Sequence, residues 1–200
     1  MAHAHPSSIV DKLAHAEELK MAGEHTEALA LLEEILCDDP ENITALEEVA
    51  DNELSMEHYL RAETAALRAI ALDTTSYTGH YILGFLHSRG EDWDPALTHL
   101  QLANKYQSNN AEILRCLGWA LFRHGACPQG VVTLERALNL ERDNTLILCD
   151  LGVVYLQLRR FAKARALFLH ALDVEPENER ASECVQAVEK MEKEMRGVNG

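Results

Sequence analysis

The chain has 200 residues, of which 47% are hydrophobic and 26% are charged, and this composition indicates a globular rather than a disordered protein. A formal net charge of −15 argues against nucleic acid as a partner, because cations that neutralise phosphates supply most of that affinity. The sequence has neither a long apolar run nor the pattern of a signal peptide, so we expect a cytoplasmic protein that does not insert into membranes.

The negative charge is concentrated in the first quarter of the chain. Residues 1–58 contain 15 acidic and 2 basic side chains, whereas residues 59–200 contain 18 acidic and 16 basic ones. A ligand of this protein is therefore expected to meet surfaces of different charge along the chain.

A repeat of 34 residues runs through the sequence. Gly84, Gly118 and Gly152 are separated by this interval, and Ala50 and Ala16 continue the series toward the N-terminus. Within each interval, apolar residues recur at three and four positions, and one turn signal falls near the middle. This pattern predicts two helices in each unit.

In chain order, the sequence predicts a flexible N-terminal tail, five two-helix units, a C-terminal helix and a short tail, or about eleven antiparallel helices in an all-α fold. The predicted bounds are 1–8 for the first tail, 9–42, 43–76, 77–110, 111–144 and 145–178 for the units, 179–196 for the C-terminal helix, and 197–200 for the last tail. The C-terminal helix has an apolar stripe and is expected to cap the last unit. A tail that binds a partner is the alternative.

These units resemble the tetratricopeptide repeat (TPR), and residues 9–178 carry the resemblance. The fifth unit matches the signature positions best, with Leu151, Gly152, Tyr155, Ala164, Phe168, Ala171 and Pro176. The first two units depart more from the pattern, for example with Glu53 at an aromatic position. The resemblance implies a right-handed α-α superhelix, a solenoid that binds other proteins.

No motif for catalysis or for a cofactor is present. The sequence lacks the GxSxG, HExxH and phosphate-loop patterns, and its ten histidines are scattered over different predicted helices. We therefore expect a protein that is not an enzyme and that binds neither a cofactor nor a metal ion.

In the TPR family, the first helix of each unit lines a concave groove, and the resemblance transfers those positions to this chain. The predicted groove residues are Tyr81, Phe85, Arg89, Arg115, Trp119, Phe122, Arg123, Leu146, Val153 and Leu156, and the acidic end of the groove has Glu17, Glu47 and Asp51. Family members that clamp a carboxylate use basic and amide residues where this chain has acids. The aromatic and aliphatic residues instead predict a groove for an apolar segment, provided that their rings do not turn into the core.

The function expected from the sequence is a protein–protein interaction module, acting as scaffold, adaptor or chaperone, that binds an apolar peptide or an amphipathic helix of another protein. The alternative is a structural scaffold that forms homo-oligomers through head-to-tail contacts between acidic and basic surfaces.

Overall fold

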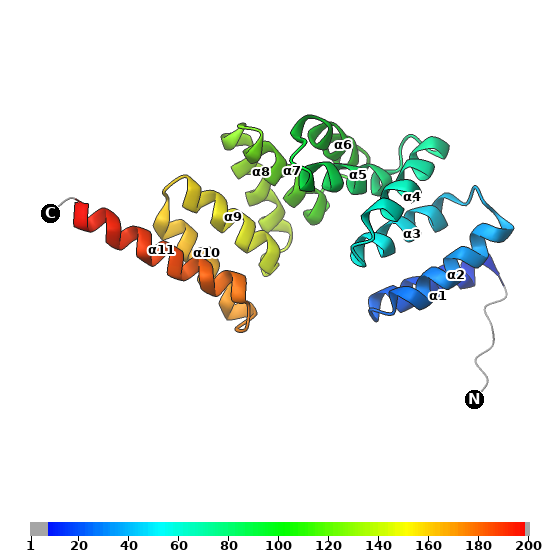
Figure 1. Cartoon of the computed structure of the whole chain (residues 1–200), viewed down its shortest axis with the longest axis horizontal. Coiled ribbons are helices and arrows are strands. Elements are labelled where there is room, and N and C mark those ends of the chain that lie inside the picture. The colour runs from blue at the N-terminus through cyan, green and yellow to red at the C-terminus, as the bar shows by residue number, and fades with distance from the viewer. Residues whose placement is uncertain (1–7, 199–200) are drawn as a thin grey trace. The chain divides into compact units, whose positions relative to one another are not determined.

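The computed structural model describes residues 8–198 of the chain, and helices joined by short turns make up this range (Figure 1). Eleven helices and no strand occur there. Their bounds are α1 (Ile9–Met21), α2 (His25–Asp38), α3 (Ile43–Ser55), α4 (Tyr59–Leu72), α5 (Tyr77–Arg89), α6 (Trp93–Tyr106), α7 (Ala111–Arg123), α8 (Cys127–Leu140), α9 (Thr145–Gln157), α10 (Phe161–Val174) and α11 (Glu179–Val198). Of the predicted N-terminal tail, only Ser8 lies within the described residues. Helix α11 continues two residues beyond the predicted end at residue 196.

Equivalent helices begin at intervals of 34 residues throughout the described part of the chain. The first helices, α1, α3, α5, α7 and α9, have 13 residues each, and the second helices, α2, α4, α6, α8 and α10, have 14 each. The five two-helix repeats predicted from the sequence are therefore confirmed. Helix α11 begins 34 residues after α9, where the first helix of another repeat would begin.

Short polar side chains fix where the first helices begin. Each cap accepts a hydrogen bond from a backbone N–H in the first turn, at 2.9–3.2 Å, and thereby satisfies an amide without a partner inside the helix. The caps are Ser8, Asn42, Ser76, Asn110, Asn144 and, ahead of α11, Asn178.

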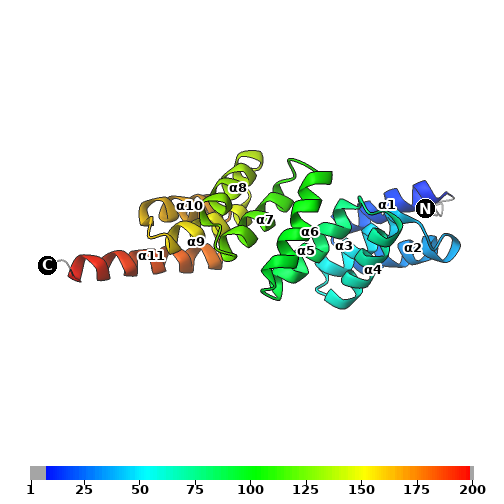
Figure 2. The same cartoon turned by 90° about the horizontal axis from the view of Figure 1, so that it is seen from above.

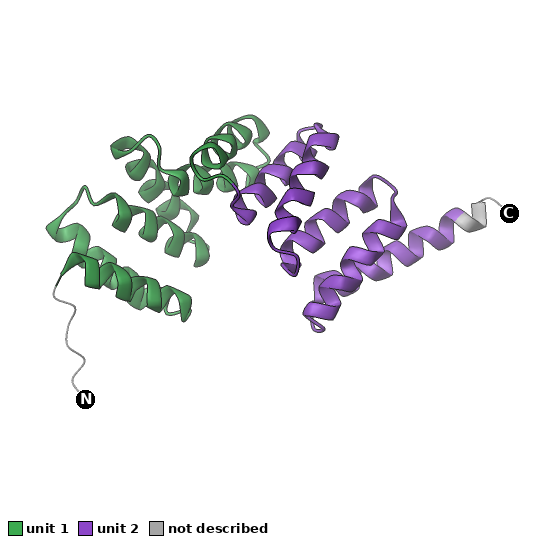
Figure 3. Ribbon diagram, turned by 180° about the vertical axis from the view of Figure 1, so that it is seen from behind, with its two compact units in different colours: residues 1–108 green, residues 109–200 purple. Residues whose placement is uncertain are grey.

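The chain divides into two compact units (Figure 3): unit 1, residues 1–108, contains α1–α6, and unit 2, residues 109–200, contains α7–α11. Unit 1 has small buried side chains in its core, mainly alanines of α2, α3 and α4 around Leu32 and Ile82. Unit 2 has a core with larger side chains, in which Phe168 is fully buried among residues of α8, α9 and α11. Each unit thus buries its own apolar surface.

Glycines let the two helices of a repeat approach closely. A Cβ placed on Gly152 of α9 would lie 2.5 Å from Cε1 of Phe168 on α10, and one on Gly84 of α5 would lie 2.6 Å from Cγ of Leu100 on α6. Both distances are shorter than van der Waals contact. The repeated glycine seen in the sequence is therefore required by helix packing.

Helix α11 lies beside α9 and α10 (Figure 2) and covers the apolar face of the last repeat. Its Ala181 and Val188 are fully buried, and Cys184 and Val185 pack against the same cluster. Gln186, the residue 34 positions after Gly152, is exposed. Because a long polar side chain stands where each repeat has glycine or alanine, α11 is poorly suited to receive a second helix of its own.

Candidate functional site

The predicted groove residues of unit 1 lie on α5, where Tyr81 and Phe85 are neighbours one helical turn apart. Their ring centroids are 6.5 Å apart, and both side chains are partly exposed. At the end of the same helix, the guanidinium of Arg89 stacks over the ring of Tyr59 at 4.2 Å, a distance at which cation–π attraction is effective. Unit 1 therefore presents two partly exposed aromatic rings followed by a cation.

The acidic end of the predicted groove is partly neutralised. Lys20 of α1 forms ion pairs with Glu48 at 2.6 Å and with Asp51 at 3.1 Å. Glu47 accepts a hydrogen bond of 2.6 Å from the hydroxyl of Ser76, and burial raises the pKa of its carboxyl group. Glu17 is exposed on α1. The net charge of this surface is thus less negative than its carboxylates alone indicate.

Arg115, a predicted groove residue of unit 2, is held by a network that joins three helices. Its guanidinium donates to both carboxylate oxygens of Glu112 and, at 2.5 Å, to Oδ2 of Asp150 on α9. Arg180 of α11 donates to the other oxygen of Asp150 at 2.8 Å. Burial is the largest single influence and opposes the charge of Arg115, but the hydrogen bonds to Glu112 and the nearby negative charges of Glu112 and Asp150 together outweigh it and raise the pKa of Arg115. Arg115 is therefore a structural residue that links α7 to α9.

Two aromatic residues of α7 have different environments. Phe122 is only 7% exposed and packs in the core of unit 2, so its ring turns inward and offers little surface to a ligand. Trp119 is partly exposed at the edge of the same cluster, with the guanidinium of Arg123 at 5.7 Å from its ring. Of the two, Trp119 has the surface that a ligand needs.

The predicted groove residues of α9 are accessible to different degrees. Val153 and Leu156 are partly buried against the core cluster of unit 2, whereas Leu146 is 52% exposed. Together with Trp119 they give unit 2 an incompletely covered apolar surface. That this surface forms one continuous patch with Tyr81 and Phe85 stays a prediction.

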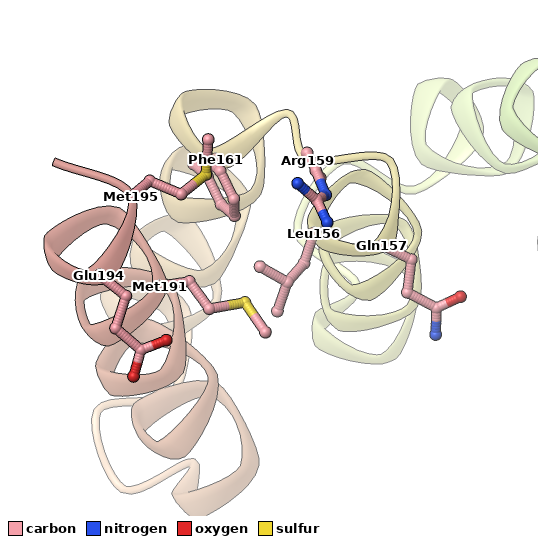
Figure 4. A pocket seen from close by; sticks show the side chains of 7 residues that line it. All are labelled: Leu156, Gln157, Arg159, Phe161, Met191, Glu194 and Met195. Carbon is pink, nitrogen blue, oxygen red and sulfur yellow. The ribbon is translucent and has the colours of Figure 1, made fainter. Parts of the chain in front are cut away.

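A pocket of about 520 Å³ opens in unit 2 where α9, α10 and α11 meet (Figure 4). Figure 4 shows Leu156 and Met191 pointing toward one another and Met195 beside Phe161. The residues that line it are Leu156, Gln157, Arg159, Phe161, Met191, Glu194 and Met195. Of these, Leu156 and Gln157 lie at positions that the TPR resemblance assigns to the groove. The apolar stripe of the C-terminal helix and its place on the last unit were expected from the sequence, but the pocket that this helix forms with α9 and α10 was not.

Three histidines of unit 1 form a cluster between α5 and α6. The Nδ1 atoms of His80 and His99 are 3.0 Å apart, and the rings of His87 and His99 are stacked with centroids 5.8 Å apart. Among residues 8–195, no group of three or more histidine, cysteine or carboxylate side chains is arranged to hold a metal ion.

No helix in the part of the chain that the structure describes combines the length and apolarity that crossing a membrane requires.

Comparison with known proteins finds the same repeat. Residues 145–178, the fifth unit, match the family described as "Tetratricopeptide repeat". A search of curated proteins found no match.

Solved structures of TPR proteins share the fold. YrrB, described as a TPR protein with an unusual peptide-binding site, is 21% identical, with a TM-score of 0.63 over 90% of this chain and 92% of that chain. TTC0263 of Thermus thermophilus is 22% identical, with a TM-score of 0.71 over 90% of this chain and 98% of that one. A chain of the APC/C hetero-tetramer Cut9–Hcn1 is 18% identical, with a TM-score of 0.84. The match covers 94% of this chain and 38% of that one. At these identities the likeness establishes the fold alone, and it confirms the all-helical solenoid class.

Proposed function

Because this chain has the fold of tetratricopeptide-repeat proteins, whose repeats generally mediate protein–protein interaction, we propose that it binds an apolar peptide or an amphipathic helix of another protein and has no enzymatic activity. It would act as a scaffold, an adaptor or a chaperone-like factor. The observation that carries the proposal is the partly exposed Trp119 on a first helix, beside the cation of Arg123. Tryptophan and arginine are the residues most often found at binding hot spots.

The apolar side chains of the first helices supply enough surface for measurable affinity. Each anchor that a ligand buries against Trp119, Val153 or Leu156 contributes about 1.5–3 kcal/mol from apolar area, before the entropic cost of association is subtracted. Two or three such anchors together contribute about 3–9 kcal/mol, and the free energy left after that cost corresponds to weak, millimolar binding that is readily reversible.

Peptides selected on the wild-type protein from a displayed random library provide the test. We expect Trp119→Ala combined with Phe85→Ala to weaken their binding at least about tenfold, because both anchoring rings are lost. Leu146→Gln is a second variant that preserves the fold, because Leu146 is already half exposed. Circular dichroism should show the same helix content in all variants.

Two exposed apolar residues on second helices provide the matched control. Leu67→Ala on α4 and Val132→Ala on α8 remove similar side chains, one in each unit, without touching a predicted groove residue. Their binding should equal that of the wild type. Undiminished binding by both the Trp119/Phe85 and the Leu146 variants would place the site elsewhere.

A further inference from the structure

The pocket of unit 2 exists because α11 does not end where the preceding first helices end. Its counterparts α7 and α9 stop at Arg123 and Gln157, and 34 residues later this position is Met191. Helix α11 continues straight through this point and brings Met195 beside Phe161, the first residue of α10 (Figure 4). The extension therefore adds Met195 to the apolar wall formed by Leu156, Phe161 and Met191.

These walls remain accessible. Met191 is 45% exposed and Met195 is 41% exposed, and they are four residues apart on one side of α11. Residues four apart form a ridge on the surface of a helix, and the ridges of one helix pack into the grooves of another. Methionine side chains are flexible and adapt to the shape of an incoming apolar group.

The edge of the pocket is basic on the side of the turn between α9 and α10. Arg159 lines the pocket, Arg160 follows it, and both side chains are exposed. Within the described residues, neither guanidinium has a carboxylate at ion-pair distance, in contrast to Arg115, Arg165 and Arg180. Glu194 lies on the α11 side of the same pocket. A ligand that complements the charge of this pocket therefore has acidic residues where it meets Arg159 and Arg160.

We propose that this pocket binds an amphipathic helix of another protein, which inserts apolar side chains between Met191, Met195, Leu156 and Phe161 and places acidic residues against Arg159 and Arg160. A helix fits better than an extended segment, because the described part of unit 2 has no strand edge to pair the backbone amides of an extended ligand, whereas a helix satisfies its own. The inference rests on the proposed function in one respect, namely that the ligand is a protein.

Two labelled peptides test the charge of the partner. They share one leucine-rich helical sequence and differ only in their flanks, which carry glutamates in one peptide and lysines in the other. At low ionic strength, fluorescence anisotropy should show that the glutamate peptide binds the full chain about tenfold more tightly than the lysine peptide. Equal affinities, or no binding of either peptide, would overturn the proposal.

Variants of the pocket separate its charged and apolar contributions. Arg159→Glu with Arg160→Glu should invert the preference, and Met191→Gln with Met195→Gln should weaken both peptides. All four side chains are exposed, and Glu57 and Glu91 already occupy left-handed turn positions equivalent to Arg159, so we expect these variants to fold. A preference that survives the arginine substitutions would contradict the proposed role of the basic edge.

The Trp119/Phe85 variant distinguishes the two proposals. If it loses the library peptides but still discriminates between the glutamate and lysine peptides, the pocket is a binding site of its own. If the preference for glutamate flanks disappears in that variant, the peptides bind at the predicted groove residues and the pocket proposal is wrong. A wild-type chain that dimerises, and becomes monomeric on Met191→Gln with Met195→Gln, would identify a second copy as the occupant and overturn the choice of partner.

Discussion

Asp150 of α9 and Arg180 of α11 are joined by a hydrogen bond of 2.8 Å between Oδ1 and Nη2, and this bond ties the last helix to the repeat that it covers. The Asp150 side chain is only 6% exposed, and its other oxygen receives Arg115 from α7. One buried carboxylate thus connects three helices of unit 2. Because each of its two oxygens has a cationic partner, its burial is compensated.

Removing this carboxylate should destabilise unit 2 strongly. Asp150→Ala takes one of two carboxylate partners from the largely buried Arg115 and leaves it Glu112, and breaking a buried pair of this kind costs about 3 kcal/mol. Arg180→Ala should cost about 1 kcal/mol or less, because that side chain is half exposed. Urea denaturation measures both losses, and equal losses would contradict the central role assigned to Asp150.

Two glycines of unit 2 should respond to alanine for different reasons. Gly152→Ala forces a Cβ against Phe168 and should cost about 1–3 kcal/mol through overpacking. Gly125→Ala meets open space, but its backbone has φ +101°, so we expect a loss of about 1 kcal/mol from conformational strain alone.

A second substitution separates these two causes. Phe168→Ala removes the ring atoms that clash with a side chain at position 152, so Gly152→Ala should cost less in that background than in the wild type. The cost of Gly125→Ala should not change. Additive losses for Gly152→Ala and Phe168→Ala would show that the close approach is not the reason for the glycine.

The repeat and its helices could be predicted because they depend on local patterns. Small residues at intervals of 34 mark the crossing points of helices, and apolar residues at three and four positions mark their buried faces. The caps of the first helices also recur at this interval, from Asn42 to Asn144, and a search for capping residues would have located the starts of these helices to the residue.

The candidate site could be predicted only in part, because exposure depends on contacts between distant residues. Trp119 and Phe122 are three residues apart on α7, and their spacing does not distinguish the partly exposed ring from the buried one. Arg115 was expected to face a ligand, but Asp150, 35 residues later, binds it. The pocket likewise depends on where Met191 and Met195 lie relative to Leu156 and Phe161, which no local pattern of residues specifies.

The asparagine caps should contribute measurably to stability. The side chain of Asn144 accepts hydrogen bonds from the amides of Leu146 and Ile147, and Asn144→Ala should cost about 1 kcal/mol. The matched control is Asn139→Ala on the exposed face of α8, which removes the same side chain within a helix and should be neutral or slightly stabilising. Thermal unfolding of the two variants checks this contrast.

The histidine pair of unit 1 has a defined arrangement of protons when both rings are neutral. The carbonyl oxygen of Thr74 lies 3.2 Å from Nε2 of His80, and a carbonyl can only accept, so this nitrogen carries the proton. Nδ1 of His80 is then an acceptor, and His99 donates to it from its own Nδ1. Adding protons to both rings would place two donors 3.0 Å apart.

This arrangement should make the α5–α6 pair sensitive to acid. Burial, followed by the charges of His80 and His87, lowers the pKa of His99 below its ordinary value of 6.5. At pH values between the lowered pKa of the folded state and the ordinary value of 6.5, unfolding is accompanied by the uptake of a proton. The stabilisation is therefore complete above pH 6.5 and is lost as the pH falls through the lower pKa of the folded state. The carboxylate of Asp92 lies 3.9 Å from Nδ1 of His87 at the edge of this cluster.

Hydrogen exchange of the amides of α5 and α6, compared at neutral pH and at about pH 5 after correction for intrinsic rates, measures this effect. Protection should fall in the acid sample of the wild type and fall less in His99→Gln, which keeps a donor but does not titrate. His15→Gln on the exposed face of α1 is the matched control and should behave as the wild type. Equal loss of protection in wild type and His99→Gln would show that the acid sensitivity of this helix pair has another origin.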